Sequence, residues 1–371
     1  MTQRPPGPET LRVLLEQALH PDDGGDPLFS GAVAAVRVNG QTVAEASAGL
    51  TFRYRDGEGL ERRGDPVSRD ALFDLASITK IFVTATALAA FEERHMLGNG
   101  LSSLRRPVSE WLPEFRPEPF GDVTVLDLLT HRSGLPSEWD ANSPGPDAWH
   151  RFRTTMPEHP AGTVHAYSCV GFIWLGLLLE ELSGSSLDDL MTRLILDPLD
   201  LSRTGYRPTE TRDRIVATEI QTGRGLVHGE VHDETAWALG GVSGNAGLFS
   251  TAPELLRFAE MLRNGGTSAG RRILSREAVE LMTKPVPGPL SGEFRQGLGL
   301  RLGEPAARLF ARDAERLPAG HGGFTGTAFA FVPGGERSVV LLSNRVHPRR
   351  GNDERFASFR QDVLEWAAGR I

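Results

Sequence analysis

The segment Asp74-Leu-Ala-Ser77-Ile-Thr-Lys80-Ile-Phe82 contains one of only two lysines in a chain that has 38 arginines. The other lysine, Lys284, precedes Pro285 and needs no functional role. Arginine stays protonated at any accessible pH, whereas a lysine amine in a dry environment can lose its proton and act as a base. A lysine kept three residues after a serine therefore indicates a chemical role for Lys80.

The spacing of Ser77 and Lys80 is close to one helical turn, so both side chains are expected on the same face of a helix. Ser77 is expected at the start of that helix, where the dipole favours a developing negative charge. A serine hydroxyl needs a neighbouring base to become a nucleophile. The apolar neighbours Ile78, Ile81 and Phe82 are expected to desolvate the amine and lower the pKa of Lys80. The pair predicts a nucleophile with its base already in place.

Hydrophobic periodicity predicts strands near both ends of the chain and mostly helices between them. Residues 31–38 and 41–48 alternate around Asn39-Gly40, the two-residue signal for a tight hairpin. The further predicted strands cover residues 296–302, 325–332 and 337–343, and the predicted terminal and central helices cover residues 9–20, 77–96 and 353–368. A long loop rich in Pro, Gly and Trp is expected at 136–162.

The order of these elements predicts an α/β (α+β) fold in one catalytic domain, residues 1–371. Its α/β lobe is expected to combine residues of about 10–76 with 292–371, and a mainly helical lobe of about 77–291 is inserted between them. At 371 residues and 39% hydrophobic composition, the chain is long enough to bury a large core.

The overall charge excludes two classes of partner. A formal net charge of −8, without a basic face, argues against binding to nucleic acid or to an anionic membrane surface. The N-terminus lacks the pattern of a secretory signal, and no stretch approaches the length of a membrane span, so a cytoplasmic location is expected. Cys169 is the only cysteine, which excludes an internal disulfide and a cysteine-based zinc site.

Three separated segments resemble the motifs of the penicillin-recognising serine hydrolases, a superfamily that includes class C β-lactamases, D,D-peptidases and family VIII carboxylesterases. They are Ser77-Ile-Thr-Lys80, Tyr167-Ser168-Cys169, where relatives usually carry Tyr-x-Asn, and His321-Gly322-Gly323, where relatives carry Lys-Thr-Gly or a variant. Phrases typical of the family lie at 128–136, 198–204, 240–250 and 342–345, and the similarity runs from about residue 28 to the C-terminus.

The resemblance implies a β-lactamase/transpeptidase-like fold, with an antiparallel sheet flanked by helices, and a site that needs no cofactor and no metal. It implies that Tyr167 and Lys80 share the proton of Ser77 and later activate the deacylating water. It also implies an oxyanion hole made by the backbone N–H groups of Ser77 and Phe324. Glycines at 322 and 323 would let the substrate lie close to this strand edge.

The second and third motifs depart from the usual pattern at two substrate-binding positions. Cys169 replaces an asparagine, and a thiol cannot reproduce the hydrogen bonds of an amide, which puts amide-side-chain recognition in doubt. Cys169 is expected to pack beside the site rather than to act as a nucleophile. His321 replaces a lysine, so the fixed positive charge that receives a carboxylate is weakened. Both departures favour neutral esters.

Other polar clusters are expected to be structural. His228, Glu230, His232 and Asp233 resemble a group of metal ligands, but they lack the arrangement of a rigid zinc site. Arg349-Arg350 could contact a carboxylate, although solvated surface charge is the preferred interpretation. His131 and Arg132 are expected to tie a turn beside the site.

Three functions fit these residues, each on a small-molecule ester, amide or β-lactam. The leading hypothesis is a carboxylesterase for small or medium acyl esters with weak β-lactamase activity, in which the loop with Trp139 and Trp149 walls the pocket. The second is a D,D-peptidase, another D-amino-acid peptidase, or a β-lactamase. The third is a penicillin-binding or sensor module without turnover.

Overall fold

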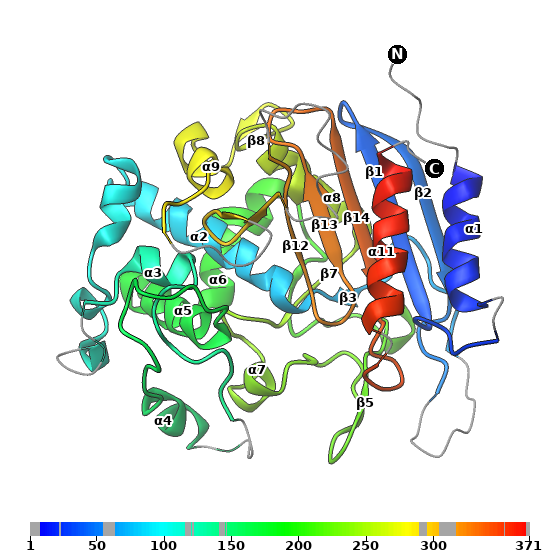
Figure 1. The fold of residues 1–371 in the computed structure, drawn as a ribbon, viewed down its shortest axis with the longest axis horizontal. Coiled ribbons are helices and arrows are strands. Elements are labelled where there is room, and N and C mark those ends of the chain that lie inside the picture. The colour runs from blue at the N-terminus through cyan, green and yellow to red at the C-terminus, as the bar shows by residue number, and fades with distance from the viewer. Residues whose placement is uncertain are drawn as a thin grey trace.

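A seven-stranded antiparallel sheet forms the centre of the computed structural model (Figure 1). The structure describes residues 8–21, 24–54, 64–115, 120, 122–140, 145, 147–288, 295–303, 317–351 and 353–368. In spatial order the strands are β10 (Arg295–Gln296), β11 (Arg301–Leu302), β12 (Ala319–Gly322), β13 (Ala328–Phe331), β14 (Arg337–Ser343), β1 (Gly31–Val38) and β2 (Gln41–Gly49). The last long strand, β14, therefore lies beside the first strand of the chain.

Helices surround the sheet and fill the middle of the chain. They are α1 (Pro8–Leu19), α2 (Thr79–Glu93), α3 (Val125–Leu129), α4 (Ala148–Arg153), α5 (Cys169–Ser183), α6 (Leu187–Met191), α7 (Glu234–Ala238), α8 (Ala252–Arg263), α9 (Arg276–Thr283) and α11 (Asp353–Ala367). Short strands form the sheets β3 (Phe73–Asp74), β7 (Leu248–Ser250) and β4 (Gly205–Tyr206); β5 (Ile220–Gln221) and β6 (Gly225–Leu226); and β8 (Thr267–Ser268) and β9 (Arg271–Arg272). This arrangement confirms the predicted fold class.

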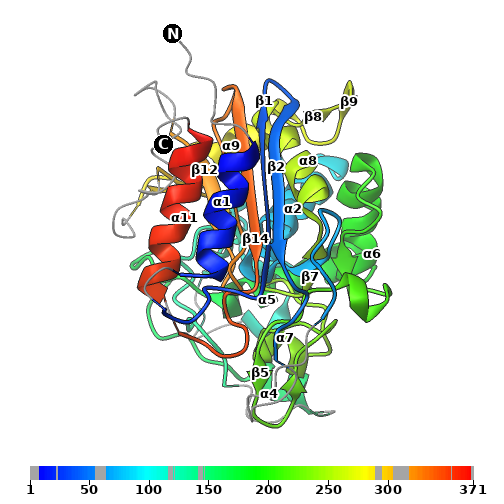
Figure 2. The ribbon, with the colours of Figure 1, turned by 90° about the vertical axis from the view of Figure 1, so that its right-hand side faces the viewer.

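Strand β1 is apolar along most of its length because both faces of the sheet are covered. Ala32, Ala34 and Val36 face α1 and α11, which lie side by side on one face (Figure 2). Val33 and Ala35 face the opposite way, into the core that α2 and α8 share. Because successive side chains of a strand point to opposite faces of the sheet, β1 contributes residues to two separate hydrophobic cores.

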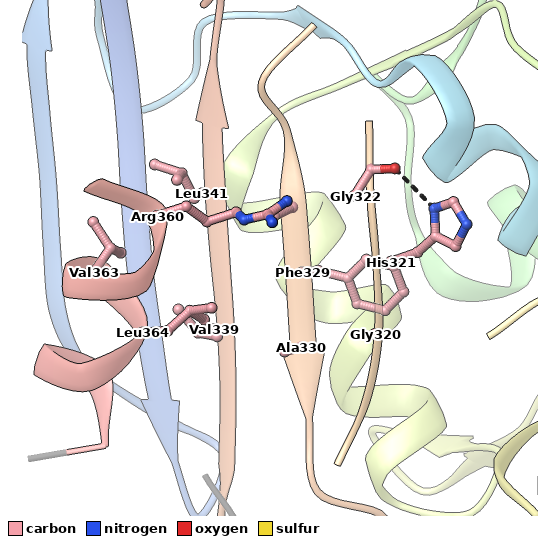
Figure 3. Close-up of a pocket in the computed structure, with 11 residues that line it drawn as sticks. Gly320, His321, Gly322, Phe329, Ala330, Val339, Leu341, Arg360, Val363 and Leu364 are labelled. Atoms are coloured by element: carbon pink, nitrogen blue, oxygen red, sulfur yellow. Dashed lines mark hydrogen bonds between the residues drawn. The ribbon is translucent and has the colours of Figure 1, made fainter. Parts of the chain in front are cut away.

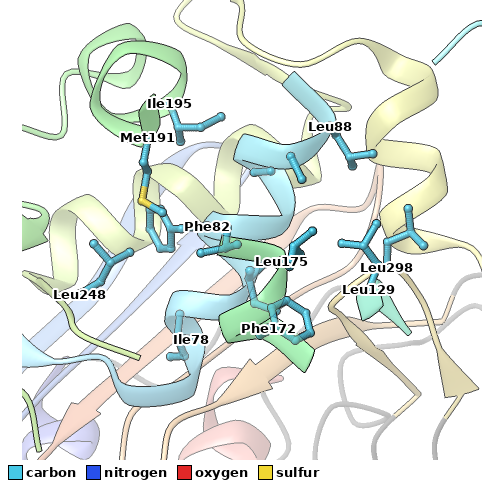
Figure 4. Packing of buried hydrophobic residues seen from close by; sticks show 14 of the residues in the cluster. Ile78, Phe82, Leu88, Leu129, Phe172, Leu175, Met191, Ile195, Leu248 and Leu298 are labelled. Carbon is cyan, nitrogen blue, oxygen red and sulfur yellow. The ribbon is translucent and has the colours of Figure 1, made fainter. Parts of the chain in front are cut away.

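The larger core surrounds α2, whose residues Thr79–Phe91 are all buried (Figure 4). The ring of Phe82 stacks on Phe258 of α8 with centroids 3.8 Å apart, and Phe258 also contacts Phe329 of β13. From the other side α5 brings Phe172 against the helix. Because α2 is enclosed on all sides, the residues at its beginning are held rigidly.

Several boundaries differ from the sequence prediction. The hairpin at Asn39-Gly40 is confirmed, with both residues at positive φ. The single strand predicted at 296–302 is wrong, because Gly299 at φ +68° folds it into the hairpin of β10 and β11. Strand β13 begins three residues later than expected. The predicted helix 77–96 begins as a 3-10 turn and ends, as α2, at Glu93.

Two further observations concern the organisation of the chain. The division into lobes near residues 77 and 291 stays a prediction, and α8, from the middle segment, packs directly on β1, β13 and β14.

No single helix within the described ranges is long and apolar enough to cross a membrane. Helices 169–183 and 187–199 meet the criterion only as a pair bent by 78°, and residues 170–179 are buried in the protein core.

Candidate active site

Ser77 lies in a 3-10 turn, Ala76–Ile78, that leads directly into α2. Ala76 has a φ of +46°, a left-handed conformation that is uncommon for a residue with a side chain. The strained turn is held by the buried carboxylate of Asp74, which accepts a 2.7 Å hydrogen bond from the Ala76 N–H. Leu75 also donates to the carbonyl of Leu248 in β7. The backbone is therefore fixed just before the predicted nucleophile.

The amine of Lys80 is fully buried and has three acceptors around it. Its Nζ lies 3.1 Å from Ser77 Oγ, 2.9 Å from the carbonyl oxygen of Asn245 and 3.4 Å from Cys169 Sγ. An ammonium group carries three N–H donors, and each acceptor matches one of them. The geometry fits the charged form of Lys80 in the free protein.

The expectation that the pKa of Lys80 is lowered is wrong. Burial does disfavour the ammonium, but the negative charges that Cys169 and Tyr167 acquire on ionisation, together with a hydrogen bond to Tyr167, hold the pKa of Lys80 above its usual range. The sequence showed the apolar neighbours of the amine and not the polar groups that converge on it.

Tyr167 brings its ring to the same place from the segment before α5. The ring centroid is 5.0 Å from Lys80 Nζ and 4.5 Å from the ring of His131. His131 holds this segment in position, since its Nδ1 accepts from the Ser168 N–H at 3.1 Å and its carbonyl accepts from the Ala166 N–H. The second motif thus lies against the first, as the sequence predicts.

The third motif is strand β12 and the turn after it. Gly323 approaches the backbone so closely that an added Cβ would lie 2.4 Å from the carbonyl oxygen of Leu75. Thr325 and Thr327 donate hydroxyl hydrogen bonds to the carbonyls of Asp74 and Leu75, at 2.8 and 3.0 Å. These contacts bring the Gly-Gly segment to the turn that precedes Ser77. A side chain at 323 would separate the two.

His321 is buried and uncharged in the structure. Burial, assisted by the positive charges of Arg301 and Lys80, lowers the pKa of His321 well below its usual range. Its Nδ1 lies 2.9 Å from the carbonyl oxygen of Gly322, so Nδ1 carries the proton that is donated to this carbonyl. The ring lies 6.3 Å from Tyr167 in a nearly parallel orientation. The third motif accordingly adds no positive charge to the site.

Comparison with known proteins agrees with this geometry. The Beta-lactamase family model matches residues 22–361. The chain belongs to the β-lactamase family. It is therefore a serine hydrolase of the β-lactamase and penicillin-binding-protein group, as the motif resemblance implies.

The similar proteins include one curated relative and two solved structures that share the fold. The chain is 30% identical to the "N-acetylmuramyl-L-alanine amidase" of Bacillus subtilis (strain 168), over 86% of this chain and 78% of that protein. The solved structure of "a class C beta-lactamase" matches with a TM-score of 0.73 at 21% identity, covering 96% of this chain and 95% of that one. The structure of "EstCE1, a hydrolase with promiscuous acyltransferase activity" matches with a TM-score of 0.70 at 21% identity, covering 96% and 98%.

Cys169, which replaces the asparagine of the usual β-lactamase-family motif, still forms a hydrogen bond within the site. It is the first residue of α5, and its sulfur accepts a hydrogen bond from Lys80. Position 169 therefore contacts the lysine even though a thiol replaces the amide. Burial raises the pKa of the Cys169 thiol, which makes it a poor nucleophile. The amide that relatives offer to a substrate is still absent.

Two residues at this β-lactamase-family site were not found from the sequence. Asn245 contributes its backbone carbonyl to Lys80, and its side-chain amide donates to Asp233 at 3.1 Å. Arg301 on β11 places its guanidinium 5.5 Å from the centroid of the Tyr167 ring. A backbone carbonyl leaves no residue signature, but the glycine-rich phrase around Asn245 did mark the segment. Nothing in the sequence distinguished Arg301 from the other arginines.

The histidines of the suggested metal cluster point in different directions. His228 Nε2 bonds to the carbonyls of Arg212 and Ile215, whereas His232 Nε2 pairs with Glu219 at 2.9 Å. Asp233 instead caps α7. Among the residues that the structure describes, no group of three or more His, Cys, Asp or Glu side chains could hold a metal ion.

The remaining predicted residues surround Phe324, whose ring is partly exposed. His232 lies nearly parallel to that ring at 5.8 Å, and the guanidinium of Arg350 lies 5.3 Å from its centroid. Arg350 is not a free surface charge, because it pairs with Glu219 at 2.9 Å and with Glu234. Its neighbour Arg349 is exposed.

Part of the segment 136–162, which was predicted to be a loop, is helical in the described residues. It contains α4, and Trp139 and Trp149 both pack edge-on against Phe152 in this helix. The Trp139 carbonyl accepts from Thr235 next to α7. A role for these tryptophans as a wall of the substrate pocket stays a prediction.

Proposed function

We propose that this protein hydrolyses carboxylic esters through an acyl-enzyme on Ser77. The observation that carries the proposal is the position of Lys80, whose buried ammonium donates to Ser77 Oγ at 3.1 Å. A serine hydroxyl becomes a nucleophile only beside groups that can take its proton and stabilise the charge. Lys80 and the adjacent Tyr167, acting as a pair, can accept the proton of Ser77 and stabilise the charge.

In the proposed acylation step, Ser77 Oγ forms a bond to the ester carbonyl carbon, and the bond from that carbon to the alkoxy oxygen breaks. The proton of Ser77 passes through the Lys80–Tyr167 pair to the leaving alcohol. The pair acts as a unit, in which one of the two groups is unprotonated before the attack and takes the proton of Ser77. Water then cleaves the acyl-enzyme by the same route.

The oxyanion that forms in both steps needs two donors that are already in place. The backbone N–H groups of Ser77 and Phe324 are assigned to this role. The close packing of Gly323 on Leu75 supports the assignment, because it holds the two segments at a fixed separation.

A preference for esters without a carboxylate follows from His321 and Cys169. The neutral imidazole cannot pair with a substrate carboxylate as a lysine would. The thiol cannot donate a strong hydrogen bond to an acylamino carbonyl. A neutral ester requires neither contact.

The test compares nitrophenyl acetate and butyrate with nitrocefin and a D-alanyl-D-alanine peptide on one preparation. We expect the highest kcat/KM on the two esters and no turnover by Ser77→Ala. Intact-mass measurement should show a transient acyl adduct on the wild-type protein and none on Ser77→Ala. Full activity in Ser77→Ala would contradict the mechanism, and a permanent adduct would favour a penicillin-binding or sensor module.

A second candidate is hydrolysis of an amide, in a peptide or a β-lactam. Arg301 favours it, because this guanidinium beside Tyr167 could receive a carboxylate in place of the missing motif lysine. The name of the Bacillus subtilis relative also points to an amide substrate. Nitrocefin or peptide turnover faster than ester turnover, together with its loss in Arg301→Gln, would favour this candidate.

A further inference from the structure

A small cavity lies between α11 and strands β12–β14, on the side of the sheet away from Tyr167 and Lys80 (Figure 3). Its volume is about 20 Å³. A cavity of this size holds a particle about as large as one water molecule. The cavity lies behind the third motif, whose residues His321 and Gly322 are among those that line it.

The cavity exists because the strands carry small residues on this face. Gly320 and Gly322 of β12, and Ala328 and Ala330 of β13, line it. Their neighbours His321 and Phe329 direct their side chains to the opposite face, as alternation along a strand requires. Larger aliphatic residues from β14 and α11 complete the wall: Val339, Leu341, Val363 and Leu364.

The one cationic side chain that lines this cavity is Arg360, from the middle of α11. Figure 3 shows it extending from the helix across the strands toward Gly322. A Cβ added to Gly322 would lie 3.2 Å from Arg360 Nη1, so the guanidinium reaches β12. The Arg360 side chain as a whole is half-buried, but its Nε is buried and has no hydrogen-bond partner among the described residues.

A buried donor on a charged group is costly when it stays unpaired, and the apolar walls supply no acceptor. One positive charge calls for one negative charge, and the cavity volume limits the size of its carrier. We propose that the cavity binds a small monovalent anion of the size of chloride, held by Arg360. Larger anions such as phosphate do not fit this volume.

The site lies directly behind the third motif. Gly322, which the guanidinium contacts, is followed by Gly323, whose packing on Leu75 positions the segment that carries Phe324. Pairing of Arg360 with an anion would fix the guanidinium against β12. Anion binding is therefore expected to stabilise the fold around this strand.

The test uses thermal unfolding of the full chain in sodium chloride and in sodium gluconate at equal ionic strength. Because a ligand that binds only the folded state stabilises it by mass action, chloride should raise the Tm saturably. The rise should be about 2 °C at a chloride concentration tenfold above the dissociation constant. Equal Tm values in the two salts at every concentration would overturn the proposal.

Arg360→Met is the decisive variant, because it keeps much of the packing of the arginine stem and removes the charge. It should lose the chloride-specific rise, whereas Arg355→Met, on the same helix but outside the cavity lining, should keep it. The same rise in Arg360→Met would overturn the proposal. Should Arg360→Met fail to fold, anomalous scattering from wild-type crystals soaked in bromide decides: a peak beside Arg360 Nε supports the site, and no peak there refutes it.

Discussion

The hydroxyl of Thr327 donates a 3.0 Å hydrogen bond to the carbonyl oxygen of Leu75, which lies 252 residues earlier in the chain. This bond joins the turn after β12 to the segment before Ser77. Together with the bond from the Thr325 hydroxyl to the Asp74 carbonyl, it fixes the distance between the backbone of the first motif and the backbone of the third. The geometry of the predicted oxyanion hole depends on this junction.

Gly323→Ala should break the junction. The new Cβ would lie 2.2 Å from Thr327 Oγ1 and 2.4 Å from the Leu75 carbonyl oxygen, so the strand has to move. Displacement of one oxyanion donor should lower kcat about 10²–10³-fold on nitrophenyl butyrate. Gly205→Ala, which meets no atom within 4 Å, is the matched control and should retain activity. Wild-type kcat in Gly323→Ala would remove this segment from the proposed mechanism.

Lys80→Arg keeps the positive charge and should still inactivate the enzyme. The planar guanidinium cannot place donors on Ser77, Cys169 and the Asn245 carbonyl in a site built for an ammonium. It also cannot exchange a proton during the cycle. We expect kcat to fall at least about 100-fold, which is the usual scale of proton-transfer catalysis. A near-normal kcat together with a normal Tm in Lys80→Arg would refute the proposed role.

Cys169→Asn should shift the substrate preference toward amides. The new side chain can still accept from Lys80, and its NH₂ group can donate to a substrate carbonyl. We expect the ratio of nitrocefin to nitrophenyl ester kcat/KM to rise. Cys169→Ser, which adds no amide, serves as the control and should leave the ratio nearly unchanged. A flat ratio in Cys169→Asn would mean that position 169 does not face the substrate.

Acid should destabilise the protein through its buried histidines. The His347 ring donates from Nδ1 to the Thr218 carbonyl and accepts at Nε2 from the Arg53 and Tyr54 N–H groups. Burial is the main cause that lowers the pKa of His347 to about 4. The unfolded state binds the proton first, so this stability is present above about pH 6.5 and is lost as the pH falls toward 4.

Urea unfolding between pH 7 and 4 measures this loss. The contribution of His347 is about 3 kcal/mol when the shift from its ordinary pKa is converted to free energy. His347→Gln should make the fall in unfolding free energy shallower, whereas His150→Gln, on the exposed surface, should leave it unchanged. An identical pH dependence in wild type and His347→Gln would contradict the assignment.

The sequence predicted the elements whose side-chain pattern is strong. Strands 31–38 and 337–343 and the helix that begins after Ser77 all carry long apolar runs. The side-chain pattern did not predict strand β12, because Gly320 and Gly322 give it little strand propensity, although the family resemblance implied a strand edge there. The pattern also merged the hairpin of β10 and β11 into one strand across Gly299. In both cases a glycine is required by the three-dimensional fold, and its lack of a side chain removes the alternating pattern from which a strand is predicted.

The residues of the candidate active site also divide into those that the sequence predicted and those that it did not. Spacing pointed to Ser77 and Lys80, and the family resemblance added Tyr167; the fold brings the three together. The sequence could not show that Lys80 also donates a hydrogen bond to the carbonyl oxygen of Asn245. Every residue has a main-chain carbonyl, so no residue type marks this acceptor. The sequence also gave the wrong direction for the pKa of Lys80, since that depends on which polar groups converge through space.

The position of β14 between β1 and β13 has a consequence for how the protein is made. During synthesis, β1 emerges about 300 residues before β14, so the edge of β1 that pairs with β14 stays unpaired until the C-terminal part of the chain leaves the ribosome. Contacts of such long sequence separation make folding slow. Production of active protein should therefore depend strongly on chaperones and on growth temperature, and chains that stop before β14 should aggregate.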